Sequence, residues 1–159
     1  MKKLIYLFLL ILPFSVHSQI TFNDLKKLDS KEDFQRLCIE QGFERARLYE
    51  EGENMTCYGY QLTSNSEEAS IWGFYYNWSY RGGEFYFSFP LDDQYLGFDG
   101  VYEKITRDIK ASCSYYSIEE EDGYDVIYYS CPGSLYQGKI GFWREGGLGH
   151  IITNSSLGK

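Results

Sequence analysis

The sequence is poor in several residue types, and each scarcity excludes a class of protein. Its 159 residues include 15 Lys and Arg against 23 Asp and Glu, a formal net charge of −8. Because clustered Lys and Arg drive phosphate binding, this balance excludes a basic nucleic-acid surface. Only 3 residues are Pro and 43% are hydrophobic, which argues against a disordered acidic chain. The length predicts a single domain.

Long apolar runs are also scarce, and the one that stands out lies at the N-terminus. Residues 1–18 have the pattern of a secretory signal peptide: Lys2 and Lys3, an apolar stretch over 4–14, and a small residue at Ser18. The apolar stretch is too short to span a bilayer. Cleavage before Gln19 leaves 13 basic and 23 acidic side chains, a net charge of −10, and one histidine, His150. We therefore predict a secreted or periplasmic single domain over 19–159, without a membrane span.

The four cysteines lie in the predicted mature chain, and no C-x-x-C motif is present. An exported chain with an even cysteine count is typical of disulfide bonding rather than of redox or metal chemistry. Three pairings are open. The nearly equal spacings of 19 and 18 residues favour Cys38–Cys57 and Cys113–Cys131. With a single histidine to contribute, no metal site and no cofactor are expected.

Two stretches of the chain follow the same order of predicted elements. In the first, Ser30 begins a helix that Gly42 ends. In the second, Asp99 begins a helix in which apolar residues recur every four positions up to Cys113. Strands are predicted over 43–49, 54–62, 70–80 and 84–89, and again over 114–118, 124–131, 138–144 and 148–153.

The predicted fold class is therefore α+β, with an antiparallel sheet of about eight strands and helices on one face. The order of elements suggests a tandem duplication of an α-β-β-β-β unit over 22–90 and 98–153. Coincidence is the alternative, since glycine turns and aromatic strands recur in many β-rich domains.

Aromatic residues are abundant, at 19% of the chain with 16 Tyr. A sheet with helices on one face leaves the other face to solvent or to a partner. Alternation puts Phe85, Phe87 and Phe89 on one side of their strand and Tyr86 on the other. Because Tyr and Trp suit interfaces, we predict a binding surface made by Trp72, Tyr76, Trp78, Tyr86, Tyr129 and Trp143. The alternative is that these rings fill a wide core.

Residues arranged for catalysis are few. No G-x-S-x-G elbow accompanies His150. Asp92 and Asp93 are adjacent on a linker, whereas glycosidases hold two carboxyl groups across a cleft. Bridged cysteines do not act as nucleophiles. We therefore predict a protein that is not an enzyme, and an enzyme that uses His150 or a carboxylate pair is the weaker hypothesis.

The layout of cysteines, aromatic strands and turns resembles the β-lactamase inhibitor protein family. The likeness rests on the spans Cys38 to Cys57 and Cys113 to Cys131, and on the Gly-Phe-Trp-Arg segment at 141–144. It implies two helix-plus-four-strand repeats, each with a disulfide, which form one curved sheet that grips an enzyme. No inhibitory residue of that family is assigned to this chain. The periplasmic lysozyme inhibitors are similar in being small, secreted, disulfide-bonded and β-rich.

These observations favour a secreted or periplasmic binding protein that inhibits a basic secreted enzyme. An acidic surface attracts basic partners and speeds their association. The alternative is a small-ligand or glycan-binding envelope protein, in which the same aromatic rings act as stacking platforms.

Overall fold

The computed structural model describes residues 20–47, 54–63, 68–78, 82–91, 100–131 and 139–154. The predicted signal peptide lies outside these residues. The described helices and strands are α1 (Phe22–Leu25), α2 (Lys31–Glu40), β1 (Phe43–Arg45), β2 (Met55–Tyr60), β3 (Ile71–Trp78), β4 (Gly82–Pro90), α3 (Val101–Ser112), β5 (Ser114–Glu121), β6 (Tyr124–Ser130), β7 (Lys139–Glu145) and β8 (Leu148–Asn154).

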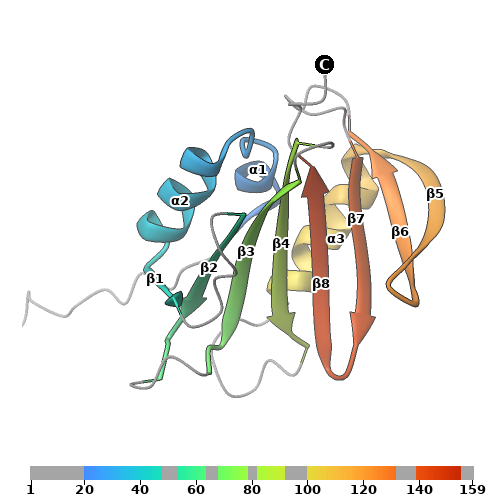
Figure 1. The fold of residues 1–159 in the computed structure, drawn as a ribbon. Coiled ribbons are helices and arrows are strands. Elements are labelled where there is room, and N and C mark those ends of the chain that lie inside the picture. The colour runs from blue at the N-terminus through green and yellow to red at the C-terminus, as the bar shows by residue number, and fades with distance from the viewer. Residues whose placement is uncertain are drawn as a thin grey trace, which may run out of the picture.

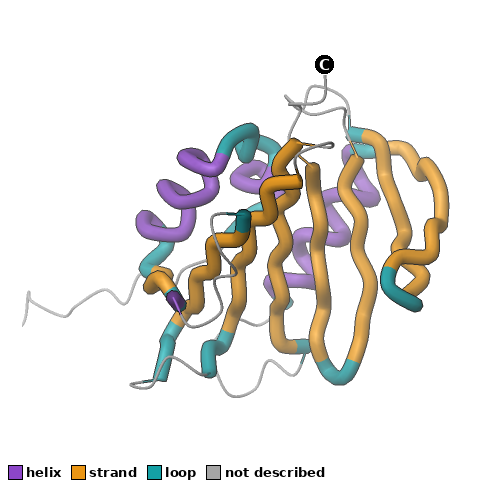
Figure 2. Tube along the Cα trace, in the orientation of Figure 1, coloured by secondary structure: helices purple, strands orange, loops and turns teal. Residues whose placement is uncertain are grey.

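All eight strands form one antiparallel sheet in the order β1-β2-β3-β4-β8-β7-β6-β5 (Figure 1). The pairing of β4 with β8 joins two four-strand units at the centre, and each unit follows a helix. Figure 2 shows the strands side by side, with α3 passing behind them. The predicted α+β class and the eight-strand sheet are confirmed, and the proposed duplication remains an interpretation of this order.

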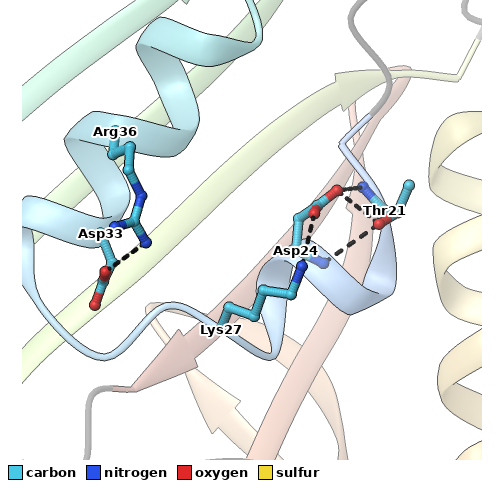
Figure 3. A network of polar contacts seen from close by, with 5 residues as sticks. All are labelled: Thr21, Asp24, Lys27, Asp33 and Arg36. Carbon is cyan, nitrogen blue, oxygen red and sulfur yellow. Dashed lines mark hydrogen bonds and ion pairs between the residues drawn. The ribbon is translucent and has the colours of Figure 1, made fainter.

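Side-chain hydrogen bonds mark the starts of the first two helices, and Figure 3 shows Thr21 with Asp24 at α1 and the contact of Asp33 with Arg36 on α2. The Ser30 hydroxyl accepts a hydrogen bond from the Asp33 amide, as the sequence predicts for α2. Thr21 and Asp24 form a reciprocal capping box at α1, a helix that the sequence reasoning did not predict. The α3 cap differs from the prediction. Gly100 occupies the cap position without a side-chain hydrogen bond, and Asp99 lies outside the described residues.

The acidic hairpin between β5 and β6 is tighter than the sequence indicated. The predicted strand 114–118 extends to Glu121, and only Asp122 and Gly123 form the turn. Both turn residues have positive φ, at 51° and 86°, the conformation that a two-residue hairpin loop requires. Since Asp-Gly supplies that loop, Glu119 to Glu121 continue the strand instead of forming part of a wider turn.

The core lies between the helices and one face of the sheet. Phe34 of α2 is fully buried, and its ring lies 5.7–6.2 Å from those of Tyr58, Tyr75, Phe85 and Phe87. On the other half, the Tyr102 ring of α3 lies where a Cβ on Gly149 would be, so the absence of a side chain there lets α3 approach β8. Both helices therefore cover the same face of the sheet.

The structure confirms one predicted disulfide and corrects the other. Cys113, at the end of α3, is bonded to Cys131, which follows β6. Cys38 and Cys57 are buried and remain thiols. Cys57 pairs in register with Phe74, whereas its neighbour Tyr58 packs on Phe34 beneath α2. Alternation therefore points Cys57 away from the face where Cys38 lies, which explains why equal spacing was misleading.

Candidate functional site

The sheet face opposite the helices carries the candidate site, and we call it the open face. Register places Trp72, Phe74 and Tyr76 of β3 on this face, opposite Ser88, Tyr86 and Glu84 of β4. Across the centre of the sheet, Tyr86 is opposite Ile152, and Ser88 is opposite His150. On the remaining strands, Trp143 is opposite His150. Side chains that are far apart in the sequence thus meet on one surface.

Seven rings form a continuous aromatic band across the open face. Three of them stack along β3, with centroid separations of 6.0 Å for Trp72–Phe74 and 6.2 Å for Phe74–Tyr76. Phe74 contacts Tyr86 at 5.6 Å and continues the band into β4. The band is made of Trp72, Phe74, Tyr76, Tyr86, Tyr124, Trp143 and His150.

The centre of the band is the stack of Tyr86, His150 and Trp143. The His150 ring lies 4.9 Å from Trp143 and 5.5 Å from Tyr86, and the Tyr86 hydroxyl is hydrogen-bonded to His150 Nδ1. His150 is only 5% exposed, and burial lowers its pKa from the ordinary value of 6.5. Glu145 opposes this effect to a smaller extent. His150 is therefore neutral at pH 7.

Within the part of the chain that the structure describes, two nitrogens of this stack, His150 Nε2 and Trp143 Nε1, are buried without a hydrogen-bond partner. A buried unpaired donor costs about 1–3 kcal/mol. Burial also raises the pKa of Tyr86, so its hydroxyl stays protonated at neutral pH. The stack therefore consists of neutral groups, and His150 Nε2 is buried within it.

At the end of the band that lies on β6 and β7, aromatic side chains contact carboxylates. The Tyr124 ring stacks 6.4 Å from Trp143, and its hydroxyl donates to Glu145. The Tyr128 hydroxyl likewise donates to Glu121. The hydrogen bond to Glu145 raises the pKa of Tyr124, and burial, followed by the bond to Glu121, raises that of Tyr128. These phenols hold the carboxylates in place while remaining uncharged.

Charge is unevenly divided between the two faces. Among the described strand residues, register and alternation put five carboxylates and one ammonium on the open face: Glu44, Glu84, Glu119, Glu121, Glu145 and Lys139. The bases on the helix side include Arg144, which pairs with Glu103 of α3, and Arg36 of α2, which pairs with Asp33. The open face is thus acidic as well as aromatic.

Four of the six predicted surface residues come together in the aromatic band: Trp72, Tyr76, Tyr86 and Trp143. Tyr129 does not. Its ring stacks on Phe142 at 5.6 Å and is partly buried on the helix side of the sheet, so Tyr129 is not part of the aromatic band. The reason is strand alternation: Tyr128 lies on the open face, so its neighbour Tyr129 points to the helix side. Trp78 ends β3, and its side chain lies outside the described residues.

Sequence reasoning missed Phe74, Tyr124, His150 and Glu145 as members of this surface. Phe74 lies on the same side of β3 as Trp72 and Tyr76, so alternation along the strand is sufficient to predict it. The turn at Gly146 and Gly147 fixes the register that sets Trp143 opposite His150. In the sequence, this Gly-Gly turn is the signal from which the contact between Trp143 and His150 could be predicted.

Comparison with family models, curated proteins and solved structures found no match to this chain. The resemblance to the β-lactamase inhibitor protein family therefore stays a prediction. Among the described residues, no helix is long and apolar enough to cross a membrane. The same part of the chain holds no cluster of three or more His, Cys, Asp or Glu side chains suited to a metal ion.

Proposed function

We propose that this protein is an exported, non-catalytic binding protein whose open face binds a basic protein, such as a secreted hydrolase that it inhibits. One observation carries the proposal: a seven-ring aromatic band lies on the same face as five carboxylates and one ammonium. Trp and Tyr supply contact area with a polar tip, and they are enriched at protein interfaces.

The charge on this face favours a cationic partner. Carboxylates flank the band at Glu84 beside Tyr76 and at Glu145 beside Tyr124. A Lys or Arg side chain placed between such a carboxylate and a ring would gain both an ion pair and a cation–π contact. Acidic fields also speed the approach of basic partners at low salt.

Export is part of the proposal and rests on two observations. Residues 1–18 have the pattern of a signal peptide, and Cys113–Cys131 is a disulfide, which is consistent with an oxidising compartment. Disulfides are rare in the reducing cytosol. We therefore assign the mature chain to the periplasm or the extracellular medium.

The test is capture by the immobilised, oxidised chain of residues 19–159. A panel of basic and acidic secreted hydrolases and an envelope extract are passed over the wild type and two variants. Trp72→Ala/Tyr76→Ala removes open-face rings, and Tyr115→Ser/Ile118→Ser removes exposed side chains from the opposite side. We expect stoichiometric, salt-sensitive capture of a basic protein that only the first variant loses. Capture lost only in the second variant, or none by folded wild type, contradicts the proposal.

A second candidate, glycan binding, is favoured by the row of rings along β3. Trp72, Phe74 and Tyr76 lie nearly parallel, at interplanar angles of 25° and 17° between neighbours. Such a row can stack against successive sugar faces. Titration with chitin-, cellulose- and peptidoglycan-derived oligosaccharides, followed by tryptophan fluorescence, tests it. A saturable change that is lost in Trp72→Ala supports this function, and an unchanged signal removes it.

A further inference from the structure

Strand β5 forms one margin of the sheet, and its outer edge carries no neighbouring strand in the described part of the chain (Figure 1). Six of its eight residues are exposed and two are half-buried. The strand at the other margin, β1, has only three residues, and α2 packs against it. An exposed edge strand presents backbone N–H and C=O groups to any strand that approaches it.

The two-residue turn after β5 determines which backbone groups point outward. Glu121 and Tyr124 flank this turn, and the residues that flank such a turn exchange both of their backbone hydrogen bonds. Hydrogen-bonded and non-hydrogen-bonded pairs alternate along an antiparallel ladder. Ile118 and Glu120 are therefore in non-hydrogen-bonded pairs with β6, and their N–H and C=O groups are directed to the outer edge.

This edge is held in a fixed position and has a defined length. The Cys113–Cys131 disulfide joins the residue before β5 to the residue after β6. A shift of register between Tyr115 and Ser117 limits the regular edge to residues 117–121, which span about 17 Å. Because the edge is formed in advance, a strand that binds there loses less free energy to ordering.

The charge along this edge indicates the chemistry of its occupant. Glu119, Glu120 and Glu121 are consecutive, and among the described residues none of them forms an ion pair with Lys or Arg. By contrast, α1, α2 and α3 each carry a carboxylate that is paired with a base. Ser117 donates a hydrogen bond to Glu119, and Tyr128 donates one to Glu121. Since like charges placed opposite one another destabilise a sheet, this edge disfavours a second copy of itself and favours a basic strand.

We propose that residues 117–121 bind an extended basic segment of a partner protein as an additional antiparallel strand. Backbone hydrogen bonds form at Ile118 and Glu120. Lys or Arg side chains at alternate positions of the segment lie opposite Glu119 and Glu121. Strand addition of this kind takes affinity from the main chain and specificity from alternate side chains. Binding at this edge does not require the aromatic band, because none of its seven rings lies on β5.

The test uses a peptide of about eight residues in which Thr and Lys alternate, together with two N-methylated isomers of it. Methylation of the Thr nitrogens removes the N–H groups that face Ile118 and Glu120, whereas methylation of the Lys nitrogens removes those that face away. The two isomers have the same charge and composition. We expect the Thr-methylated isomer to bind the oxidised chain about tenfold more weakly than the Lys-methylated isomer in fluorescence anisotropy.

Matched variants of the protein locate the binding of the unmethylated peptide. Ile118→Pro removes one outward N–H group and should weaken binding about tenfold, since proline on an edge strand leaves the hydrogen bonds to β6 in place. Ile118→Thr keeps this N–H group and should bind within about twofold of the wild type. Glu119→Gln/Glu121→Gln should weaken binding about tenfold and reduce its salt dependence. Glu32→Gln/Glu40→Gln removes two exposed charges from α2 and should leave binding unchanged.

Amide hydrogen exchange, followed by NMR, distinguishes strand addition from attraction between charges alone. The Ile118 and Glu120 amides should exchange rapidly in the free protein and about tenfold more slowly in the complex. The Glu121 amide, which is bonded to β6, should be protected in both.

Three results overturn the proposal: equal affinity of the two methylated isomers, unchanged binding by folded Ile118→Pro, and no binding to the wild type up to about 1 mM peptide. The methylated isomers probe the same hydrogen bonds without any change to the protein, so the test does not require Ile118→Pro to fold. Loss of binding in Trp72→Ala/Tyr76→Ala, with no protection of the Ile118 amide, also overturns the proposal. That result would place the basic peptide on the open face and would support the proposed function instead.

Discussion

The two halves of the sheet have the same connectivity, yet they hold their helices differently. In the first half, Phe34 of α2 inserts among four aromatic rings, and Cys38 and Cys57 remain thiols on opposite faces. In the second half, a disulfide ties the end of α3 to the end of β6. The first half buries Phe43 of its edge strand β1, whereas the second leaves Tyr115 and Ile118 of its edge strand β5 exposed.

This difference shows that strand order alone does not decide which surfaces are available. The open face is aromatic and acidic across both halves, because strand alternation determines it. The helix side differs between the halves, because helix placement determines it. Variants that affect one half and not the other should separate the two contributions.

The largest expected effect is on stability and comes from removing the Phe34 ring, which packs among four aromatic rings in the first half. Phe34→Ala should destabilise the protein by about 3–5 kcal/mol, since it opens a cavity among packed rings. Urea unfolding followed by circular dichroism measures the change. Ile39→Ala on the same helix is the control and should change stability by less than about 0.5 kcal/mol, because Ile39 is 63% exposed. Similar losses in both variants would show that α2 does not pack as described.

The next effect is loss of the disulfide in the second half. Cys113→Ser/Cys131→Ser should cost about 3 kcal/mol, the chain-entropy cost of reopening a loop of this size. Reductant should destabilise the wild type equally and leave the double variant unaffected. Alkylation of denatured, unreduced protein should label two thiols, at Cys38 and Cys57. A further loss in the double variant on reduction would reveal a second bridge in the first half.

A smaller loss of stability is expected from variants of the open face, because we propose that its rings serve binding more than folding. Trp72→Ala should cost about 1 kcal/mol of stability, because its ring is only partly buried. The same change should abolish capture of the basic partner. If stability fell as far as in Phe34→Ala, the rings of the open face would be part of the core instead of a binding surface.

The smallest effect should come from the protonation of His150. Its pKa is lowered in the folded state, so the unfolded chain binds a proton first as pH falls. This contribution to stability is fully present above pH 6.5, decreases as pH falls from 6.5 toward the lowered pKa, and is constant below it. The wild type should lose stability relative to His150→Asn in that window. Parallel pH profiles for both proteins would contradict the assignment of a buried, neutral imidazole.

The sequence predicts the sheet well because period-two alternation and turn residues are local signals. The Phe85 to Phe89 alternation gave the correct buried side, and Ser30 gave the correct start of α2. Prediction from the sequence failed for features that depend on how distant segments pack together. Equal cysteine spacing did not reveal that Cys57 and Cys38 lie on opposite faces, and a preference for Tyr and Trp selected Tyr129 although it alternates with Tyr128.

The candidate site was predicted in part for the same reason. Trp72, Tyr76, Tyr86 and Trp143 could be chosen strand by strand, but the band that connects them depends on the pairing of β4 with β8. That pairing joins residues more than sixty positions apart, as in the contact between Tyr86 and His150. No pattern within a single strand contains this information.

The most direct test of the open face as the binding surface is hydroxyl-radical footprinting, read by mass spectrometry, of the free protein and of its complex with the captured basic partner. We predict that oxidation of Trp72, Tyr76 and Tyr124 decreases in the complex, while Tyr115, which is exposed on the helix side of β5, is oxidised equally in both. Protection of Tyr115 with unchanged oxidation of Trp72 and Tyr124 would contradict the account and move the interface to the helix side of the sheet.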